Sequence, residues 1–401
     1  MDLRTASGAS NRYLIVSALG ITQILAWGST YYLPAVIAKA VSRDTGWSLE
    51  WVVGGLSLGL LIAGLVSPRV GSAIDRTGGR NVLALSAVCI GLGQMGLAVA
   101  PNLFCYVLAW LIVGIGMGAG LYDAAFATLG RHYGQQGRSL ITMLTLFGGL
   151  ASTICWPLSA VLLEQFGWRG TCAAYALIQL LIALPLYLFV LPPKAPEQSS
   201  GAVSSGMPKE RSSRRYLMPV LLAVALTLSA ITTSTLSVHL LNILQAGGLT
   251  LAAAVALGAL VGPSQVTARA VEMAVARYHH PIWTKMASVG FVVLGVGALF
   301  LNLPIVPLAL MFYGAGIGLE SVARGTLPLA LFGSEGYATL MGKLAMPSLL
   351  AQAAAPSIAA ILIERAGAHT ALGVLVSIAI LNVFLAGGLA WLYRLRHAHA
   401  I

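Results

Sequence analysis

Apolar stretches long enough to cross a lipid bilayer follow one another along almost the whole 401-residue chain. A bilayer-spanning helix needs about 20 apolar residues, and backbone polar groups inside a bilayer must be paired within helices or closed barrels. The pattern predicts an all-α integral membrane protein with twelve transmembrane helices. The expected spans are residues 13–38, 49–68, 82–100, 103–129, 139–163, 169–192, 216–243, 249–276, 284–302, 304–330, 338–363 and 368–393.

The composition excludes a water-soluble fold. Mean hydropathy is +0.86, and only 9% of the residues are charged, whereas soluble domains average about 25%. The formal net charge of +11 would suit a nucleic-acid partner, but the basic residues are scattered between apolar stretches and form no patch or stripe. We therefore expect the lipid bilayer, and no nucleic acid, as a partner.

Basic residues distribute unevenly between the two sides of the predicted bundle. One side holds Arg4, Arg12, Arg69, Arg76, Arg80, Arg131, Arg138, the segment 194–215, Arg277, Lys285, Arg394 and Arg396, and the other holds Lys39, Arg43, Arg169 and Arg365. By the positive-inside rule both termini are cytoplasmic. The Pro-, Ser- and Gly-rich segment 193–215 predicts a flexible cytoplasmic linker between an N-terminal half, residues 1–192, and a C-terminal half, residues 216–401.

The two predicted halves share sequence features at an offset of about 200 residues. The glycine ladder 116–120 is followed by Thr128-Leu129, and the ladder 314–318 is followed by Thr326-Leu327. The segments 163–167 and 363–367 also match, because each ends in a glycine after Glu-x-x. Glycine ladders occur in many packed membrane bundles, but their recurrence at equivalent positions predicts a duplicated carrier with two pseudo-symmetric six-helix halves.

The loop after the second span reads Gly71-Ser-Ala-Ile-Asp75-Arg76-Thr-Gly78-Gly79-Arg80. It matches the loop motif of the major facilitator superfamily, although Asn81 stands where a second basic residue is usual. The chain resembles this superfamily over essentially its whole length, which implies the major facilitator fold. Gly71 and Gly78 permit close helix approach, and Asp75 can cap a helix and pair with arginines across the halves. We assign these residues, with Arg76 and Arg80, to a cytoplasmic gate; the alternative is an ordinary solvated reversal loop.

Within the superfamily, the chain is most similar to the branch of monocarboxylate transporters and the oxalate/formate antiporter. The similarity rests on three stretches: Thr45-Gly46-Trp47-Ser48, Gly167-Trp168-Arg169 and Gln265-Val-Thr-Ala-Arg269. It implies that Arg269 pairs with the substrate carboxylate. Gln265 stands where the branch has a proton-accepting aspartate, a departure that bears on proton coupling. Lys343 resembles the antiporter's lysine in the eleventh span, so we expect it to bind substrate, with snorkelling toward cytoplasmic water as the alternative.

Several charged side chains lie inside predicted spans, where each costs at least about 2.5–3.5 kcal/mol on insertion scales. Arg269 and Glu272 are three residues apart, and Glu320 and Arg324 are four apart, so each pair can neutralise itself along one helix. The functional alternative places Glu272 and Arg324 in the cytoplasmic gate. Asp123 and Glu320 are the proton-coupling candidates, because a carboxyl group desolvated by burial can titrate near neutral pH.

A histidine beside a polar stripe and two tyrosines are further candidates for lining a central cavity. His239 follows the polar stripe 232–237, which predicts a cavity-facing surface, and the histidine is either a proton relay or a hydrogen-bonded structural residue. Tyr31, which precedes Pro34, and Tyr122 are cavity-lining candidates, with anchoring at the membrane interface as the alternative. The substrate-binding candidates are Arg269, Lys343, Gln265, His239, Tyr31 and Tyr122.

These features predict a secondary active transporter and not an enzyme. The sequence lacks the phosphate-loop and dinucleotide-binding patterns, so we expect no cofactor, no metal, and a gradient of substrate, proton or other ion as the driving force. The expected substrate is a small organic anion, a mono- or dicarboxylate, moved by symport or antiport. The alternatives are proton-coupled efflux of a drug, siderophore or other apolar solute, and a non-transporting receptor or sensor. We expect a monomer in the plasma membrane, of the bacterial inner-membrane type.

Overall fold

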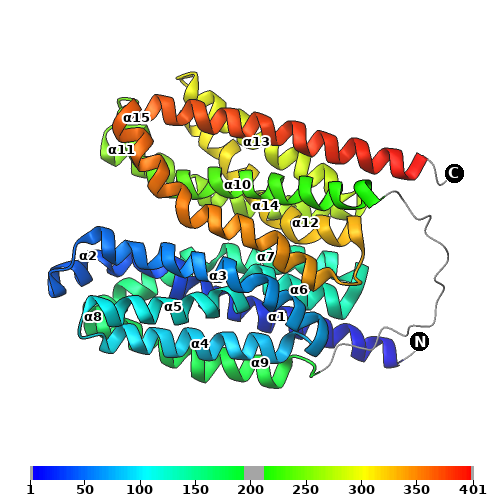
Figure 1. Cartoon of the computed structure of the whole chain (residues 1–401), viewed down its shortest axis with the longest axis horizontal. Coiled ribbons are helices and arrows are strands. Elements are labelled where there is room, and N and C mark those ends of the chain that lie inside the picture. The colour runs from blue at the N-terminus through cyan, green and yellow to red at the C-terminus, as the bar shows by residue number, and fades with distance from the viewer. Residues whose placement is uncertain (1–2, 194–211, 399–401) are drawn as a thin grey trace. The chain divides into compact units, whose positions relative to one another are not determined.

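The computed structural model describes the backbone of residues 3–193 and 212–398. All regular structure in these two ranges is helical, and neither range contains a strand (Figure 1). The predicted all-α class is therefore confirmed. Most of the predicted linker, residues 194–211, lies outside the described residues, so the division of the chain at this linker stays a prediction.

The chain divides into two compact units. Unit 1 comprises Met1–Lys194 and Phe332–Ala353, and unit 2 comprises Ala195–Leu331 and Ala354–Ile401. The first part of the predicted eleventh span therefore belongs to the same unit as the N-terminal helices. Each unit is described by itself.

Unit 1 consists mainly of long helices joined by short turns. Its helices are α1 (Leu3–Trp27), η1 (Gly28–Tyr32), α2 (Leu33–Thr45), α3 (Leu49–Thr77), α4 (Gly79–Val99), α5 (Leu103–Gly120), α6 (Tyr122–Tyr133), η2 (Gly134–Gln136), α7 (Gly137–Gly149), α8 (Ala151–Ile178), η3 (Gln179–Ala183) and α9 (Leu184–Val190). The π-helical turn η1 ends two residues before Pro34, close to where the sequence predicts a kink. Within this turn the carbonyl of Ser29 accepts a hydrogen bond from the buried amide of Gln94.

The remaining helices lie mainly in unit 2. They are α10 (Ser212–Ala246), α11 (Leu251–Gly258), α12 (Val261–Val275), η4 (Ala276–Tyr278), α13 (Pro281–Phe300), α14 (Val306–Phe332) and α15 (Tyr337–Ala398). The last of these begins in unit 1 and continues in unit 2.

The described helices account for the twelve predicted spans. Ten stretches are long and apolar enough to cross a membrane. One of them, Leu103–Val190, is 88 residues long and is interrupted at Gly134 and Gly167, whose φ angles are +55° and +66°. Such left-handed backbone favours glycine, and the two breaks divide this stretch into three segments.

The internal repeat predicted from the sequence is visible in the backbone. Gly167 interrupts α8 with φ 66° and ψ 178°, and Gly367 interrupts α15 with φ 84° and ψ 160°. Both glycines end the repeated segments 163–167 and 363–367, so the same break occurs at equivalent positions of the two predicted halves.

The second glycine ladder brings α14 against α12 and α13. A Cβ atom at Gly318 would lie 2.6 Å from the carbonyl oxygen of Gln265, and one at Gly316 would lie 2.9 Å from the carbonyl oxygen of Ser288. Real side chains do not fit at such separations, so small residues are required for this helix approach. The first ladder approaches α3 and α4 in the same way, through Gly116 and Gly118 of α5.

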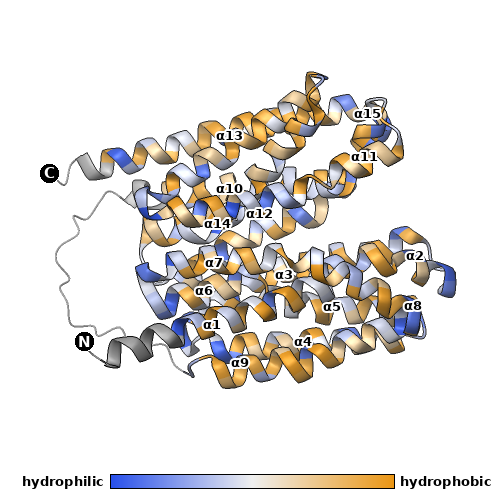
Figure 2. Ribbon diagram, turned by 180° about the vertical axis from the view of Figure 1, so that it is seen from behind, coloured by the Kyte–Doolittle hydropathy of each residue, from blue (hydrophilic) through white to orange (hydrophobic). Residues whose placement is uncertain are grey.

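Many large apolar side chains of the helices are exposed, and hydrophobic residues predominate along the ribbons in Figure 2. Phe104, Phe189 and Phe384, for example, are 70%, 84% and 72% exposed. Exposed apolar surface of this extent marks a surface that contacts lipid or another apolar partner. It agrees with the predicted membrane location of these helices.

Candidate functional site

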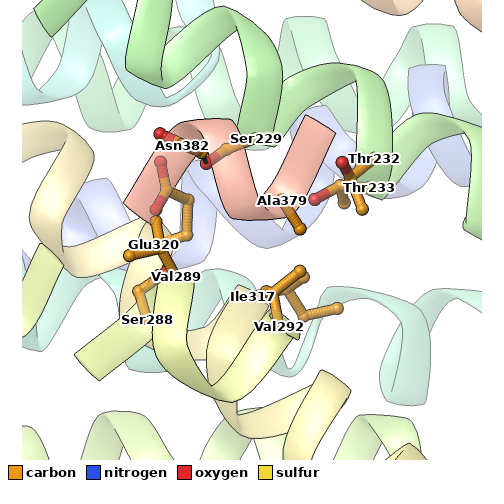
Figure 3. A pocket seen from close by; sticks show the side chains of 10 residues that line it. All are labelled: Ser229, Thr232, Thr233, Ser288, Val289, Val292, Ile317, Glu320, Ala379 and Asn382. Atoms are coloured by element: carbon orange, nitrogen blue, oxygen red, sulfur yellow. Dashed lines mark hydrogen bonds between the residues drawn. The ribbon is translucent and has the colours of Figure 1, made fainter. Parts of the chain in front are cut away.

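A small pocket lies within unit 2, between α10, α13, α14 and α15 (Figure 3). Its lining residues are Ser229, Thr232, Thr233, Ser288, Val289, Val292, Ile317, Glu320, Ala379 and Asn382. The polar stripe predicted to face a cavity thus contributes Thr232 and Thr233. Hydroxyl, amide and carboxylate groups from four helices meet in this pocket, opposite an apolar wall of valine, isoleucine and alanine side chains.

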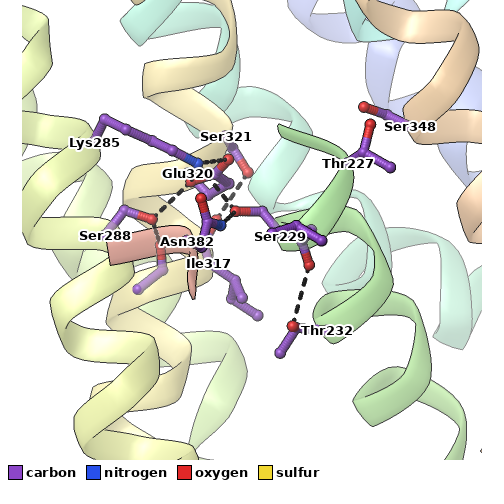
Figure 4. A network of polar contacts seen from close by, with 12 residues as sticks. Thr227, Ser229, Thr232, Lys285, Ser288, Ile317, Glu320, Ser321, Ser348 and Asn382 are labelled. Carbon is purple, nitrogen blue, oxygen red and sulfur yellow. Dashed lines mark hydrogen bonds and ion pairs between the residues drawn. The ribbon is translucent and has the colours of Figure 1, made fainter. Parts of the chain in front are cut away.

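Lys285 of α13 and Glu320 of α14 form an ion pair beside the pocket (Figure 4). The Lys285 Nζ atom lies 2.7 Å from Glu320 Oε1 and 2.9 Å from Oε2, and it donates to Ser229 Oγ at 3.0 Å. The lysine side chain is 0% exposed, whereas that of Glu320 is 14% exposed. Glu320 lines the pocket and Lys285 does not, so the carboxylate borders both the buried ammonium group and the pocket.

Asn382 of α15 extends this polar network. Its Nδ2 donates to Ser229 Oγ at 2.8 Å, the same oxygen that accepts from Lys285. Asn382 is 3% exposed, and its Oδ1 atom is buried without a hydrogen-bond partner. A buried acceptor of this kind is costly when it stays unpaired, so the pocket wall offers an acceptor that a donor would satisfy.

The local sequence explains how Lys285 reaches this position. Helix α13 begins with Pro281, whose fixed φ suits a first helical position, and the ring of His280 accepts from the Ile282 N–H at 3.2 Å. This start puts Lys285 in the second turn and Ser288 three residues later on the same helix face. Ser288 Oγ lies 2.9 Å from Glu320 Oε2, and the helix approach at Gly316 holds the two faces together.

Arg269 lies on α12 and is held against α14. It is 4% exposed; its Nε donates to the Gly318 carbonyl at 3.3 Å and its Nη2 to Ser321 Oγ at 2.9 Å. Nη2 also lies 3.4 Å from Gln265 Oε1. The structure therefore joins two of the predicted substrate-binding residues, Arg269 and Gln265, next to the residue that follows Glu320. Neither of them lines the pocket.

Glu320, a proton-coupling candidate, and Glu272, a predicted gate residue, bond between helices and not along one helix. Glu320 pairs with Lys285 and not with Arg324, which corrects the expectation drawn from their spacing. Glu272 is 6% exposed; Thr284 Oγ1 donates to its Oε1 at 2.7 Å, and His279 Nε2 lies 3.5 Å from its Oε2. In the described chain no group of three or more His, Cys, Asp or Glu side chains is arranged to hold a metal ion.

His239 connects α10 with α15. Its Nε2 lies 2.9 Å from the carbonyl oxygen of Pro356, and the side chain is 8% exposed. It does not line the pocket. This geometry matches the hydrogen-bonded structural alternative, and a role in substrate binding stays a prediction.

The predicted cytoplasmic gate lies in unit 1, where α3 meets the start of α15. Asp75 Oδ2 accepts a hydrogen bond from the backbone N–H of Thr339 at 2.7 Å, and α15 begins at Tyr337, so the carboxylate caps this helix. A Cβ atom at Gly71 would overlap the carbonyl oxygen of Ala338. The predicted cap of a helix by Asp75 is thus found at the N-terminus of α15, and its pairing with arginines across the halves stays a prediction.

The other gate residues surround this contact. Gly78 ends α3 with a φ angle of +83°, which favours glycine. Arg76 is exposed and Arg80 is half-buried. Arg76 Nε donates to the Ser72 carbonyl at 3.4 Å. Their roles in gating stay predictions.

The remaining candidates belong to unit 1. Tyr31 and Tyr122 both pack on Trp27, with ring centroids 5.3 Å and 5.2 Å from it. Asp123 lies half-buried in the first turn of α6, and Lys343 is exposed on α15. Because Lys343 and Arg269 belong to different units, joint binding of one anion by the two stays a prediction.

The sequence reasoning missed the central cation of the site. It counted Lys285 only as a charge on the cytoplasmic side and gave no role to Ser229, Ser288 or Asn382. Two signals were available: Pro281 marks a helix start four residues before Lys285, and Asn382 is an isolated amide in an otherwise apolar span. Neither signal names Glu320 as the partner, because that pairing depends on how two helices pack.

Comparison with known proteins identifies the family. The family model of the Major Facilitator Superfamily matches residues 19–277, more than half of the chain. Monocarboxylate transporter 11 of Homo sapiens is 32% identical over 171 residues, which cover 40% of this chain and 34% of that protein. A gallate transporter of Pseudomonas putida is 27% identical over 160 residues, 40% of this chain and 35% of that protein. The chain thus spans little more than a third of either relative.

A solved structure shows the same fold. The crystal structure of the human organic anion transporter MFSD10 (TETRAN) matches with a TM-score of 0.73, covering 94% of this chain and 99% of that chain. Their sequences are 18% identical, so this likeness concerns the fold alone. The protein is therefore a multi-pass membrane protein that belongs to the Major Facilitator Superfamily and has its twelve-helix fold.

Proposed function

We propose that the protein is a secondary active transporter that moves a small organic anion, a mono- or dicarboxylate, by alternating access. Membership of the superfamily supports transport as the activity. The names of the two curated relatives, a monocarboxylate transporter and a gallate transporter, support an organic acid as the substrate.

The observation that carries the proposal is the charge buried in unit 2. Helices α12, α13 and α14 hold three cationic side chains, Arg269, Lys285 and Arg324, and two carboxylates, Glu272 and Glu320. Two of the cations are almost completely buried, at 4% for Arg269 and 0% for Lys285. Charge inside a membrane protein is expensive and usually marks a substrate or ion path, and a surplus of cations suits an anion.

The pocket has the composition that a small organic acid requires. Donors for a carboxylate come from the hydroxyl groups of Ser229, Thr232 and Thr233, and Val292 and Ile317 offer contact to a hydrocarbon part. Small-molecule sites commonly combine an apolar lining with a few placed polar groups. Arg269 of α12 does not line the pocket but binds Ser321, the residue after Glu320, and its planar guanidinium group suits a carboxylate. In this proposal Lys343 remains a second candidate cation.

Alternating access also requires a contact that breaks and reforms. The cap of Asp75 on α15 and the close approach of α3 at Gly71 form a compact contact of this kind in unit 1. We assign it the role of the cytoplasmic latch, with Arg76, Gly78 and Arg80 as its surroundings. Proton symport and anion exchange are both compatible with this arrangement.

Substrate binding by the purified protein tests the proposal. Isothermal titration with a panel of mono- and dicarboxylates, and with apolar and cationic compounds, should give saturable binding for a carboxylate. Hydrogen bonds to charged groups contribute about 1.5–3 kcal/mol, so Arg269→Gln should weaken carboxylate binding by about tenfold or more. The matched control is Arg365→Gln, which replaces an exposed arginine of the same unit and should leave the affinity unchanged.

Three outcomes would contradict the proposal or a part of it. Binding of apolar or cationic compounds without carboxylates would move the protein to the efflux class. Carboxylate binding that is unaffected by Arg269→Gln would remove Arg269 from the site. Carboxylate binding without any flux in liposomes would favour a receptor.

A further inference from the structure

We propose that Glu320 occupies Lys285 in the empty carrier, as the substrate's carboxylate does in the loaded carrier. When Glu320 accepts a proton it leaves Lys285, and the substrate's carboxylate binds Lys285 instead. The inference rests on the proposed function and specifies how anion movement is coupled to protons. Lys285 then becomes the substrate-binding cation of the pocket, and Glu320 the coupling residue.

The arrangement of the ion pair carries the first step. Lys285 Nζ is held by both oxygens of Glu320, at 2.7 Å and 2.9 Å, and by Ser229 at 3.0 Å. Since Glu320 and Ser229 line the pocket and Lys285 does not, the ammonium group is covered on its pocket side by a carboxylate. A substrate carboxylate that enters the pocket meets the same chemistry that Glu320 now supplies, and it can bind Lys285 only in exchange for Glu320.

The second step concerns where Glu320 goes once it carries a proton. A protonated carboxyl group donates a hydrogen bond through its O–H. Lys285 cannot accept this bond, because an ammonium group has donors only. Asn382 lies beside Glu320 in the pocket wall (Figure 3), and its Oδ1 is a buried acceptor without a partner. The orphaned oxygen is the acceptor that protonated Glu320 requires.

Charge balance then couples the two ligands. In the empty carrier Lys285 is neutralised by Glu320, and in the loaded carrier it is neutralised by the substrate while Glu320 is protonated. A carrier with only the proton or only the anion holds one buried charge without a counterion. Such states should be suppressed by about 100-fold, so one proton and one carboxylate group move together, and both leave on the other side as the Lys285–Glu320 pair reforms.

The surrounding charges do not provide a second proton site in this pocket. Arg324, on the same helix as Glu320, lies within Coulombic reach of Lys285, and Arg269 of α12 binds Ser321, the next residue in the chain. Both guanidinium groups stay protonated at all relevant pH values. The contributions of α10 and α15 to the pocket are hydroxyl, amide and methyl groups, so Glu320 is the ionisable side chain among its lining residues.

The variant Glu320→Gln tests this directly in proteoliposomes. Its side-chain amide mimics the protonated carboxyl group permanently, so Lys285 has no counterion in the empty carrier. The empty carrier therefore cannot change its conformation back to the side from which it takes up substrate. Counterflow, which needs only the loaded carrier, should persist within about threefold, whereas net uptake driven by a pH gradient should fall by about 100-fold. Counterflow should also lose its dependence on pH. The control is Glu364→Gln, an exposed glutamate of the same unit, which should behave like the wild type in both assays.

A variant without either charge covers the case in which Glu320→Gln fails to fold. Replacement of a complete buried ion pair by apolar residues is often neutral or stabilising, so the double variant Lys285→Met with Glu320→Leu should fold and should lose carboxylate counterflow. Net uptake by Glu320→Gln with a normal response to the pH gradient would overturn the inference, as would counterflow by the double variant. Absence of carboxylate flux in the wild type would instead refute the proposed function and, with it, this inference.

Discussion

Removal of the Asp75 cap should open the contact between α3 and α15 by an amount that the structure defines. Asp75→Ala removes the acceptor that binds the Thr339 N–H at 2.7 Å, and loss of such a cap costs about 0.5–2 kcal/mol. The negative charge at the helix N-terminus contributes about 0.3–1 kcal/mol more. The closed contact should therefore be less stable by about 1–3 kcal/mol, which corresponds to roughly 5- to 150-fold in its population.

Asp75→Asn separates the two contributions. The amide keeps an oxygen acceptor and loses the charge, so the expected shift is about 0.3–1 kcal/mol, or roughly two- to fivefold. Hydrogen exchange of the backbone amides of residues 337–342, followed by mass spectrometry, reports the opening of this helix start. Transport turnover should fall in the same order, and substrate affinity should stay nearly unchanged because the contact does not line the pocket.

The matched control is Glu335→Ala. Glu335 is an exposed acid two residues before α15, so it shares the local charge and lacks the capping bond. Its replacement should change the exchange of these amides by no more than the Asp75→Asn variant does. Unchanged exchange in Asp75→Ala would refute the capping role, and a loss of substrate affinity with normal exchange would show that Asp75 belongs to the binding site.

Two further substitutions test the packing described above. Gly71→Ala places a methyl group against the backbone carbonyl of Ala338, so it should lower the free energy of unfolding by about 1–3 kcal/mol. The control is Gly54→Ala on the same helix, whose methyl group meets no atom within 4 Å and should be neutral or slightly stabilising. Equal melting temperatures of the two variants would contradict the close approach of α3 and α15. Lys285→Met alone leaves the Glu320 carboxylate buried without its counterion, so it should lower the free energy of unfolding by about 3–5 kcal/mol. This single variant should melt well below the double variant that also carries Glu320→Leu. A single variant as stable as the double one would show that the ion pair is solvated.

The features that local sequence dictates were predictable. Gly167 and Gly367 end repeated segments, and each breaks a helix because only glycine tolerates the backbone angles found there. Gly71 and Gly78 lie where a helix approach and a helix end require them. Gln265 and Arg269, four residues apart on one helix, also lie together. In each case the cause is a backbone conformation or a spacing along a single helix.

The partners of the buried charges were not predictable in the same way. Helical spacing pairs Glu320 with Arg324, but the packing of α14 against α13 brings Lys285 to the carboxylate at 2.7 Å. A helix cap by Asp75 was expected, but the sequence did not identify the capped helix, which is the start of α15. Both outcomes depend on which helices are neighbours and on how far the helices are shifted along their axes. A sequence pattern within one helix contains no information on these two quantities.

Counterflow of labelled carboxylates in proteoliposomes that contain the purified wild-type protein tests the central claim most directly. Liposomes loaded with unlabelled substrate should take up a labelled mono- or dicarboxylate transiently above equilibrium, saturably, and with competition from other carboxylates. Carboxylate counterflow equal to that of protein-free liposomes, together with saturable flux of cationic or apolar compounds, would contradict the account and leave Arg269 and Lys285 as structural charges.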